Sequence, residues 1–130
     1  MIVDSSAIVA ILLQESDALR IANAMAASPD CTVPASCMLE VSIVMQTRAK
    51  DQGEIALDML LARDSMKVIP FTVGQVRIAR DAFRRYGKGR HPAGLNFGDC
   101  MAYAAAKETG EELLFKGTDF GKTDIAVAAY

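Results

Sequence analysis

The sequence contains no tryptophan, one histidine and only three cysteines among its 130 residues. The cysteine count is odd and no two cysteines have the CxxC spacing, so neither a disulfide framework nor a zinc site is expected. Cys31, Cys37 and Cys100 are interpreted as small buried residues in a reducing cytoplasm, because free cysteine is among the most buried residue types. The single histidine, His91, is interpreted as a structural loop residue rather than as a general base.

Long apolar runs and a large excess of charge are also missing. The apolar run near the start, residues 7–13, is too short to cross a bilayer, and no basic segment precedes Asp4, so we expect a cytoplasmic protein without membrane association. The 14 basic and 16 acidic residues give a net charge of −2, which provides no overall attraction for nucleic acid. The hydrophobic fraction of 52% and the length of 130 residues fit a single domain over residues 1–130.

Short apolar segments alternate with helical patterns along the chain. Each apolar segment is continuous rather than alternating, which is typical of strands covered on both faces. The sequence therefore predicts an α/β fold of three layers, a parallel sheet of about five strands with helices on both faces. Strands are expected at residues 1–3, 31–33, 67–71, 113–115 and 125–129. Helices are expected at 5–13 (capped by Asp4 or Ser5), 17–27 (capped by Ser16), 35–49, 53–63, 72–86 and 96–110.

Four acidic residues are expected at one edge of this sheet. Asp4 follows the first strand, Glu40 lies in the helix after the second, and Asp119 follows the fourth, while Asp99 lies in the first turn of a helix. Sites in open parallel sheets form beyond the carboxyl ends of the strands, so these carboxylates are expected to meet. Oxygen ligands without histidine or cysteine favour Mg²⁺ or Mn²⁺ over zinc. Such a pocket can activate water for displacement at phosphorus, which indicates phosphodiester hydrolysis.

Each acid also has a structural explanation. Asp4 can cap a helix, Asp99 has the capping-box spacing from Asn96, and Asp119 can be a turn residue. Glu40 is the hardest to explain in this way, because its neighbours one turn away on the helix are mostly apolar. A carboxylate on such a face is costly to bury unless it is paired or bound to a cation.

Three segments of the chain resemble a known family. Residues 1–7, MIVDSSA, resemble the first motif of PIN-domain nucleases. Residues 86–93, YGKGRHPA, followed by residues 95–100, LNFGDC, are similar to VapC-type toxins, and so are residues 113–120, LLFKGTDF, with the TDI of residues 123–125 behind them. The resemblance covers the whole chain in order, and the second and third motifs together are specific.

The resemblance implies the toxin of a bacterial VapBC toxin–antitoxin pair, a metal-dependent ribonuclease with a PIN fold. It implies that Asp4 and Asp99 are direct Mg²⁺ ligands, with Mn²⁺ as a substitute. Glu40 and Asp119 would complete the pocket, partly through water, and Ser6 would support the first acid. Asp124 is the alternative to Asp119 for the fourth position. The implied partners are a cognate VapB antitoxin that blocks the pocket, an RNA substrate and a second copy of the chain.

Basic residues gather just before the second motif. Arg84, Arg85, Lys88 and Arg90 place four of the 14 basic residues within seven positions. Arg84 and Arg85 suit a helix end, where cations complement the dipole. Lys88 and Arg90 lie in the expected loop 87–94 and are candidates for contacts with RNA phosphates, the alternative being a solvated surface.

Other functions fit the sequence less well. A receiver-like domain should have an acidic pair after the first strand, and a dehalogenase-like phosphatase needs a second aspartate where Ser6 stands. A catalytically inactive PIN-like module that only binds RNA or protein is the remaining alternative. The presence of all four acids argues against that alternative.

Overall fold

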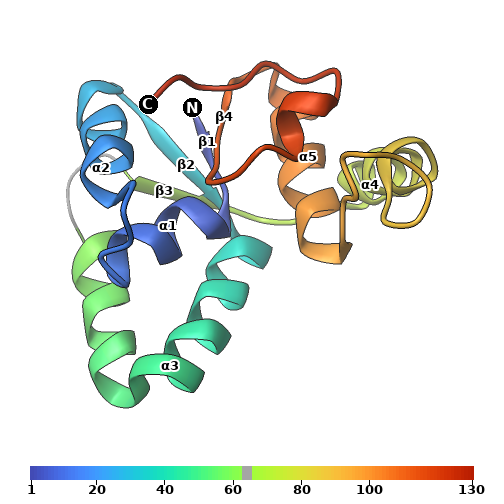
Figure 1. Ribbon diagram of the computed structural model, residues 1–130. Coiled ribbons are helices and arrows are strands. Elements are labelled where there is room, and N and C mark those ends of the chain that lie inside the picture. The colour runs from blue at the N-terminus through green and yellow to red at the C-terminus, as the bar shows by residue number, and fades with distance from the viewer. Residues whose placement is uncertain (63–65) are drawn as a thin grey trace.

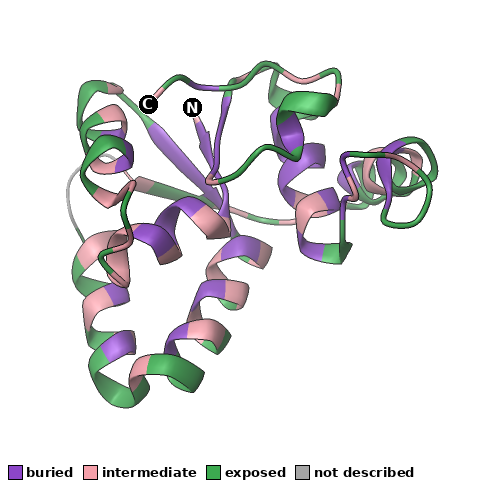
Figure 2. Cartoon of the chain, viewed as in Figure 1, coloured by how far each residue is buried: buried purple, intermediate pink, exposed green. Residues whose placement is uncertain are grey.

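The computed structural model describes residues 1–62 and 66–130, and its centre is a sheet of four parallel strands in the order β3-β2-β1-β4. Ile2 pairs with Thr32 on one side and with Leu113 on the other, so the first strand is internal. Three of the strands are fully buried, as continuous apolar segments predict, and only the edge strand β3 is partly exposed (Figure 2). The strands are β1 (Ile2–Val3), β2 (Cys31–Pro34), β3 (Met66–Ile69) and β4 (Leu113–Leu114).

Helices cover both faces of the sheet, which confirms the predicted three-layer α/β fold. In Figure 1, α1 and α2 lie on one side of the sheet, and α5 lies on the other with α4 packed outside it. α3 packs against α1 and contacts β2 and β3. The helices are α1 (Ser5–Leu12), α2 (Ala18–Ala27), α3 (Ala35–Leu61), α4 (Val73–Tyr86) and α5 (Phe97–Thr109), with a short 3₁₀ helix η1 (Phe120–Lys122).

The expected break between two helices is found inside α3. Lys50 has φ 52° and ψ −141°, which is not helical, so the two halves of α3 run in different directions and form a V in Figure 1. Near this break a Cβ on Gly53 would lie 2.9 Å from the Met45 Cβ, so only glycine allows the two halves to approach. The predicted helices 35–49 and 53–63 are thus confirmed up to Leu61, with Ala62 as the C-cap, and Arg63 lies outside the described residues.

Three expectations about element boundaries were wrong. Within the described residues the segment 125–129 forms no strand but a single bridge between Val127 and Leu113, so the sheet has four strands rather than five. Ser16 does not cap α2; Asp17 occupies the N-cap position, and no side chain accepts a hydrogen bond there. β3 ends at Ile69 rather than at residue 71, because Pro70 lacks the N–H that a continuing strand needs.

Cys31, Cys37 and Cys100 are free and buried, as expected. Among the described helices, none is both long enough and apolar enough to cross a membrane.

Candidate active site

An open pocket of about 360 Å³ lies beyond the carboxyl ends of β1 and β4. Its lining includes all four acids that the sequence singled out, and each comes from a different part of the chain. They are Asp4 after β1, Glu40 on α3, Asp99 on α5 and Asp119 before η1. The expected convergence of the four carboxylates is therefore observed.

Asp4 lies at the floor of this pocket and is buried, with 2% of its surface exposed. Its Oδ2 accepts hydrogen bonds from the Ser6 backbone N at 3.0 Å and from the Ser6 hydroxyl at 2.5 Å. The same hydroxyl accepts from the Lys116 backbone N at 3.0 Å, so Ser6 links the first acid to the chain after β4. The Cys37 thiol lies 3.9 Å from Oδ1 on the other side.

Burial raises the pKa of Asp4 to about 6, against the opposing effect of the hydrogen bonds from Ser6. The negative charges of Asp99 and Glu40 raise the pKa of Asp4 further. A carboxylate in this position is stabilised by any cation that joins the cluster. Asp4 is therefore both the N-cap of α1 and an incompletely neutralised acid at the pocket floor.

Asp99 likewise combines a structural contact with a place in the pocket. Its Oδ2 accepts from the Asn96 backbone N at 2.8 Å, and the Asn96 side chain accepts from the Asp99 backbone N at 3.0 Å. This is the capping box that the spacing predicts. Burial raises the pKa of Asp99, the Asn96 hydrogen bond opposes the shift, and the charges of Glu40 and Asp119 add to it.

Glu40 is half-buried, as its apolar helix face predicts, and it has a partner that the sequence did not reveal. Its Oε2 accepts from the Ser5 hydroxyl at 2.8 Å. The start of α5 passes very close to this carboxylate, since a Cβ on Gly98 would lie 2.6 Å from Oε2. Gly98 therefore provides the space in which the Glu40 carboxylate sits beside Asp99.

The fourth acid in the pocket is Asp119 rather than Asp124. Asp119 is exposed at the rim, and its Oδ1 lies 3.7 Å from the Lys122 ammonium. Asp124 does not line the pocket; it accepts from the Tyr103 hydroxyl at 2.5 Å and from Arg85 at 3.1 Å. Gly117, with φ 117°, makes the turn that brings Asp119 back toward the sheet edge.

Sequence reasoning missed three charged residues that line the same pocket: Glu15, Arg48 and Lys116. The Lys116 ammonium forms an ion pair with Glu15. Arg48 could have been found from its spacing, because Glu40, Val44 and Arg48 are four residues apart and share one face of α3. Glu15 and Lys116 carry no local signal, since they meet only through the tertiary fold.

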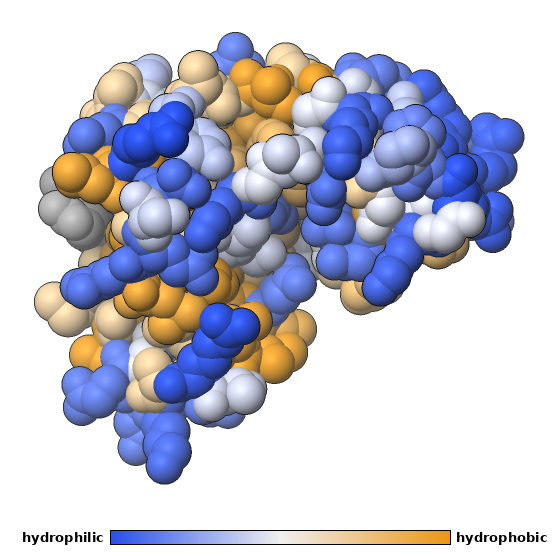
Figure 3. All heavy atoms as spheres, in the orientation of Figure 1, coloured by the Kyte–Doolittle hydropathy of each residue, from blue (hydrophilic) through white to orange (hydrophobic). Residues whose placement is uncertain are grey.

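Lys88 and Arg90 do not line the pocket. Both are exposed in the loop after α4. Hydrophilic side chains cover most of the right-hand part of the surface in Figure 3, where α4 lies in Figure 1. The Arg90 guanidinium lies over the Phe83 ring at 5.4 Å. His91 accepts from the Ala93 backbone N at 3.1 Å and packs edge-on against Tyr86 at 5.1 Å, which fits the expected structural role.

The potential metal-ligand atoms of the pocket suit a hard divalent cation. They are carboxylate, hydroxyl and amide oxygens, which Mg²⁺ prefers over zinc-type ligands. Across residues 1–62 and 66–130, no three histidine, cysteine or acidic side chains form a complete metal-binding group. That arrangement still fits Mg²⁺, which proteins usually bind through one or two carboxylates while several waters stay on the ion.

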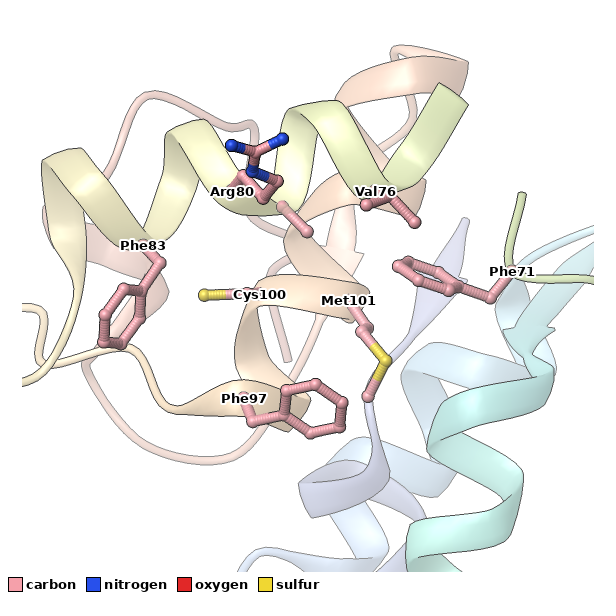
Figure 4. Close-up of a pocket in the computed structure, with 8 residues that line it drawn as sticks. Phe71, Val76, Arg80, Phe83, Phe97, Cys100 and Met101 are labelled. Atoms are coloured by element: carbon pink, nitrogen blue, oxygen red, sulfur yellow. The ribbon is translucent and has the colours of Figure 1, made fainter. Parts of the chain in front are cut away.

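A larger groove of about 630 Å³ lies between α4 and α5 (Figure 4). Its lining is mostly apolar, with Phe83 and Phe97 on one side of the view and Phe71 and Val76 on the other. Phe97 is 81% exposed. The groove has no carboxylate in its lining, which distinguishes it from the acid pocket.

Comparison with known proteins agrees with the geometry. The model of the PIN domain matches residues 1–126. Ribonuclease VapC of Mycolicibacterium smegmatis is 47% identical over 126 residues, which cover 97% of this chain and 98% of that protein. Ribonuclease VapC30 of Mycobacterium tuberculosis is 43% identical over 129 residues, which cover 99% and 98%.

Solved structures show the same fold at low identity. VapC20 of Mycobacterium tuberculosis, described as a Sarcin-Ricin loop cleaving toxin, has a TM-score of 0.79 at 15% identity and covers 96% of this chain and 95% of its own. A toxin–antitoxin complex from Klebsiella pneumoniae has a TM-score of 0.72 at 16% identity, with 99% and 97% covered. From its fold, its full-length matches and its four-acid pocket, the chain belongs to the PIN-domain family and, within that family, to the VapC ribonucleases.

Proposed function

We propose that this protein is the toxin of a type II toxin–antitoxin pair and a metal-dependent ribonuclease that hydrolyses RNA phosphodiester bonds. The observation that carries the proposal is the meeting of Asp4, Glu40, Asp99 and Asp119 in one pocket at the carboxyl edge of the sheet. The names of the relatives, ribonucleases of the VapC type, support the same activity.

We assign the proposed roles of the four acids from their contacts. Ser6 fixes Asp4, and the capping box fixes one oxygen of Asp99, so that both carboxylates are preorganised as ligands for Mg²⁺, or Mn²⁺ in its place. The bound ion would supply a water of lowered pKa and stabilise negative charge at the phosphate. Glu40, oriented by Ser5, and Asp119 at the rim complete the site and orient the attacking water. In-line attack at phosphorus breaks the bond to the 3′ oxygen and leaves 5′-phosphate and 3′-hydroxyl ends.

The proposed partners are RNA, a cognate VapB-type antitoxin and a second copy of this chain. The neighbouring structure of a toxin–antitoxin complex supports the antitoxin. The apolar groove between α4 and α5, with its exposed Phe97, supports the homodimer. Phe97→Ser should then shift the protein toward monomer in sedimentation experiments. We further propose that residues 1–130 form one PIN domain and that the protein acts in the cytoplasm, where its three free thiols stay reduced.

The activity is tested with purified protein and end-labelled RNA. Cleavage is expected in Mg²⁺ or Mn²⁺ and should stop in excess EDTA and resume when the metal is restored. Mapping of the products should show 5′-phosphate and 3′-hydroxyl ends. Full activity in excess EDTA, or products with 2′,3′-cyclic phosphates, would disprove the mechanism. Binding of RNA without any cleavage would instead support an inactive binding module.

A further inference from the structure

The lining of the acid pocket carries more negative than positive charge. Two cations, Arg48 and Lys116, face five carboxylates there: Asp4, Glu15, Glu40, Asp99 and Asp119. An RNA backbone that approaches this pocket meets the acids with like charge, even when a divalent ion neutralises part of it. The two cations of the lining are therefore the groups best placed to attract phosphates at the pocket itself.

We propose that Arg48 and Lys116 are substrate-positioning residues, which hold the RNA phosphates that flank the scissile one. Glu15 opposes them by holding Lys116 in the free protein. This inference rests on the proposed ribonuclease function and adds to it the residues that bind the backbone of the substrate.

Arg48 lies on the same face of α3 as Glu40, eight residues later. A rise of 1.5 Å per residue separates them by about 12 Å along the helix axis, so Arg48 reaches a neighbouring phosphate rather than the reacting one. The residue is exposed, and within residues 1–62 and 66–130 no carboxylate forms an ion pair with it. Its planar guanidinium can bind a phosphate through two parallel hydrogen bonds.

Lys116 is tied to the site through its main chain. Its backbone N donates to the Ser6 hydroxyl, which in turn donates to Asp4, so the residue has a fixed place beside the pocket floor. The ammonium of Lys116 is paired with Glu15, and the two side chains are 30% and 31% exposed. A phosphate that binds Lys116 must share it with Glu15 or displace Glu15.

Both cations also have a purely structural explanation. Arg48 stands in the last turn before the break at Lys50, where a cation complements the helix dipole, and the Lys116–Glu15 pair joins the segment between α1 and α2 to the loop after β4. These roles would alter the stability of the protein and leave its response to RNA and salt unchanged. Binding and its salt dependence therefore separate the two explanations.

The experiment uses a short labelled single-stranded RNA as the probe. KM and kcat are measured in Mg²⁺ for the wild type and for Arg48→Ala, Lys116→Ala, Arg48→Lys and Glu15→Gln. Binding of the same RNA at several salt concentrations is measured in the Asp99→Asn background, where cleavage does not remove the probe. Lys67→Ala is the matched control, because Lys67 forms an ion pair with Asp30 at 2.7 Å and does not line the pocket.

Arg48→Ala and Lys116→Ala should each raise KM and the dissociation constant about 3- to 10-fold, with a smaller change in kcat. Each should also reduce the magnitude of the salt slope by about 0.7, the value for one contact to single-stranded nucleic acid. Arg48→Lys should restore the slope, and Glu15→Gln should tighten binding because it releases Lys116. Lys67→Ala should behave as the wild type.

Two kinds of failure are distinguishable. A wild-type protein that never cleaves RNA in Mg²⁺ or Mn²⁺ overturns the proposed function. A wild-type protein that cleaves, while Arg48→Ala and Lys116→Ala keep the KM and salt slope of Lys67→Ala, overturns the present inference and leaves the function standing. Weaker binding by Glu15→Gln overturns the opposing role of Glu15.

Discussion

The acid pocket and the surroundings of Asp124 shift the pKa of an aspartate in opposite directions. Asp124 accepts a hydrogen bond from Tyr103 and pairs with Lys107 and Arg85, and these contacts lower its pKa to about 2. Asp4 is buried among other carboxylates, and its pKa is raised to about 6. An aspartate that serves the fold is thus neutralised by donors from the protein, whereas the pocket leaves its acids to be neutralised by something that binds.

Position in the fold produces this contrast. Arg85, Tyr103 and Lys107 come from α4 and α5, so Asp124 attaches the C-terminal segment to that pair of helices. The pocket lies at the sheet edge, where five chain segments contribute carboxylates and only two contribute cations. Preorganised like charges of this kind are typical of functional sites, because the fold pays for them elsewhere.

The largest effect on RNA cleavage should come from replacing aspartate with asparagine in the acid pocket, compared with the same replacement at Asp124. Asp4→Asn and Asp99→Asn should each reduce RNA cleavage by about 10³-fold or more, since each removes a charged ligand. Asn still accepts the cap hydrogen bonds that Asp99 and Asp4 accept, so both variants should remain folded by circular dichroism. Asp124→Asn is the matched control and should keep cleavage while it lowers the melting temperature. Near-normal cleavage by Asp99→Asn would reduce Asp99 to a helix cap.

The two regions should also respond to pH in opposite directions when metal is removed. Because the folded protein raises the pKa of Asp4 from 3.8 to about 6, it binds that proton more tightly than the unfolded chain does. In EDTA, stability should therefore rise as the pH falls from about 7 toward about 4, by up to about 3 kcal/mol for a shift of this size.

Asp124 has the reverse sign: its lowered pKa gives stability that is present above about pH 4 and is lost as the pH falls toward about 2. This contribution is small, because the Asp124 side chain is 36% exposed and screened by solvent. Urea unfolding in EDTA at several pH values measures both effects. Asp4→Asn should reduce the rise between about pH 7 and about pH 4 and leave the part that comes from Asp99, whose pKa is also raised; an unchanged rise in that variant would assign all of it to other groups.

Gly98→Ala tests the geometry of the pocket rather than its charge, because it moves a carboxylate without removing one. The added Cβ would lie 2.6 Å from the Glu40 Oε2, so the flexible end of Glu40 must shift away from Ser5 and Asp99. Misplacement of a positioned group by about 1 Å can cost about 10- to 100-fold in rate. We expect a loss of this size in cleavage with a nearly unchanged melting temperature. A loss of folding with no specific loss of activity would show that the helix, not Glu40, needs the glycine.

Glu40→Gln removes one of the like charges and keeps an oxygen that can accept from Ser5. In EDTA at neutral pH this variant should be more stable than the wild type by about 1–3 kcal/mol, from the relief of repulsion at intermediate dielectric. Added Mg²⁺ should stabilise the wild type more than the variant, so the two melting curves converge as metal is raised. A metal-free variant less stable than the wild type would mean that Glu40 makes a net stabilising contact.

The fold was largely predictable because local signals decide it. The continuous apolar segment before Asp4 predicts a buried central strand, and the Thr72–Gln75 and Asn96–Asp99 capping boxes predict two helix starts that the structure confirms. The fifth strand failed because whether residues 125–129 pair with β4 depends on the path of the chain after η1 rather than on their own composition. Ser16 failed as a cap because neighbouring Asp17 is equally suited to the position.

The site was only half predictable, for a related reason. The acids could be placed, since each lies after a strand or in the first two turns of a helix that starts at one sheet edge. The choice of Asp119 over Asp124 follows from contacts with Arg85 and Tyr103, which no local pattern contains. Glu15 and Lys116 meet from positions 101 residues apart, so only the tertiary structure shows them together.

The smallest effect is expected outside the pocket, from the double variant Lys88→Ala with Arg90→Ala. Both residues are exposed in the loop after α4, and neither lines the acid pocket. The loop is nevertheless attached to the pocket rim, because Lys122 donates to the Pro92 carbonyl at 3.2 Å and lies 3.7 Å from Asp119. RNA that extends from the pocket along η1 would therefore reach it.

If Lys88 and Arg90 contact phosphates there, their removal should weaken RNA binding a few-fold and flatten its salt dependence, since fewer counterions are released. The rate at saturating RNA should hardly change, because neither residue approaches the reacting phosphate. The effect should be smaller than that of Arg48→Ala combined with Lys116→Ala, which lie in the pocket itself. An unchanged salt slope would show that Lys88 and Arg90 face solvent only, and that attraction for the RNA backbone is confined to the lining of the pocket.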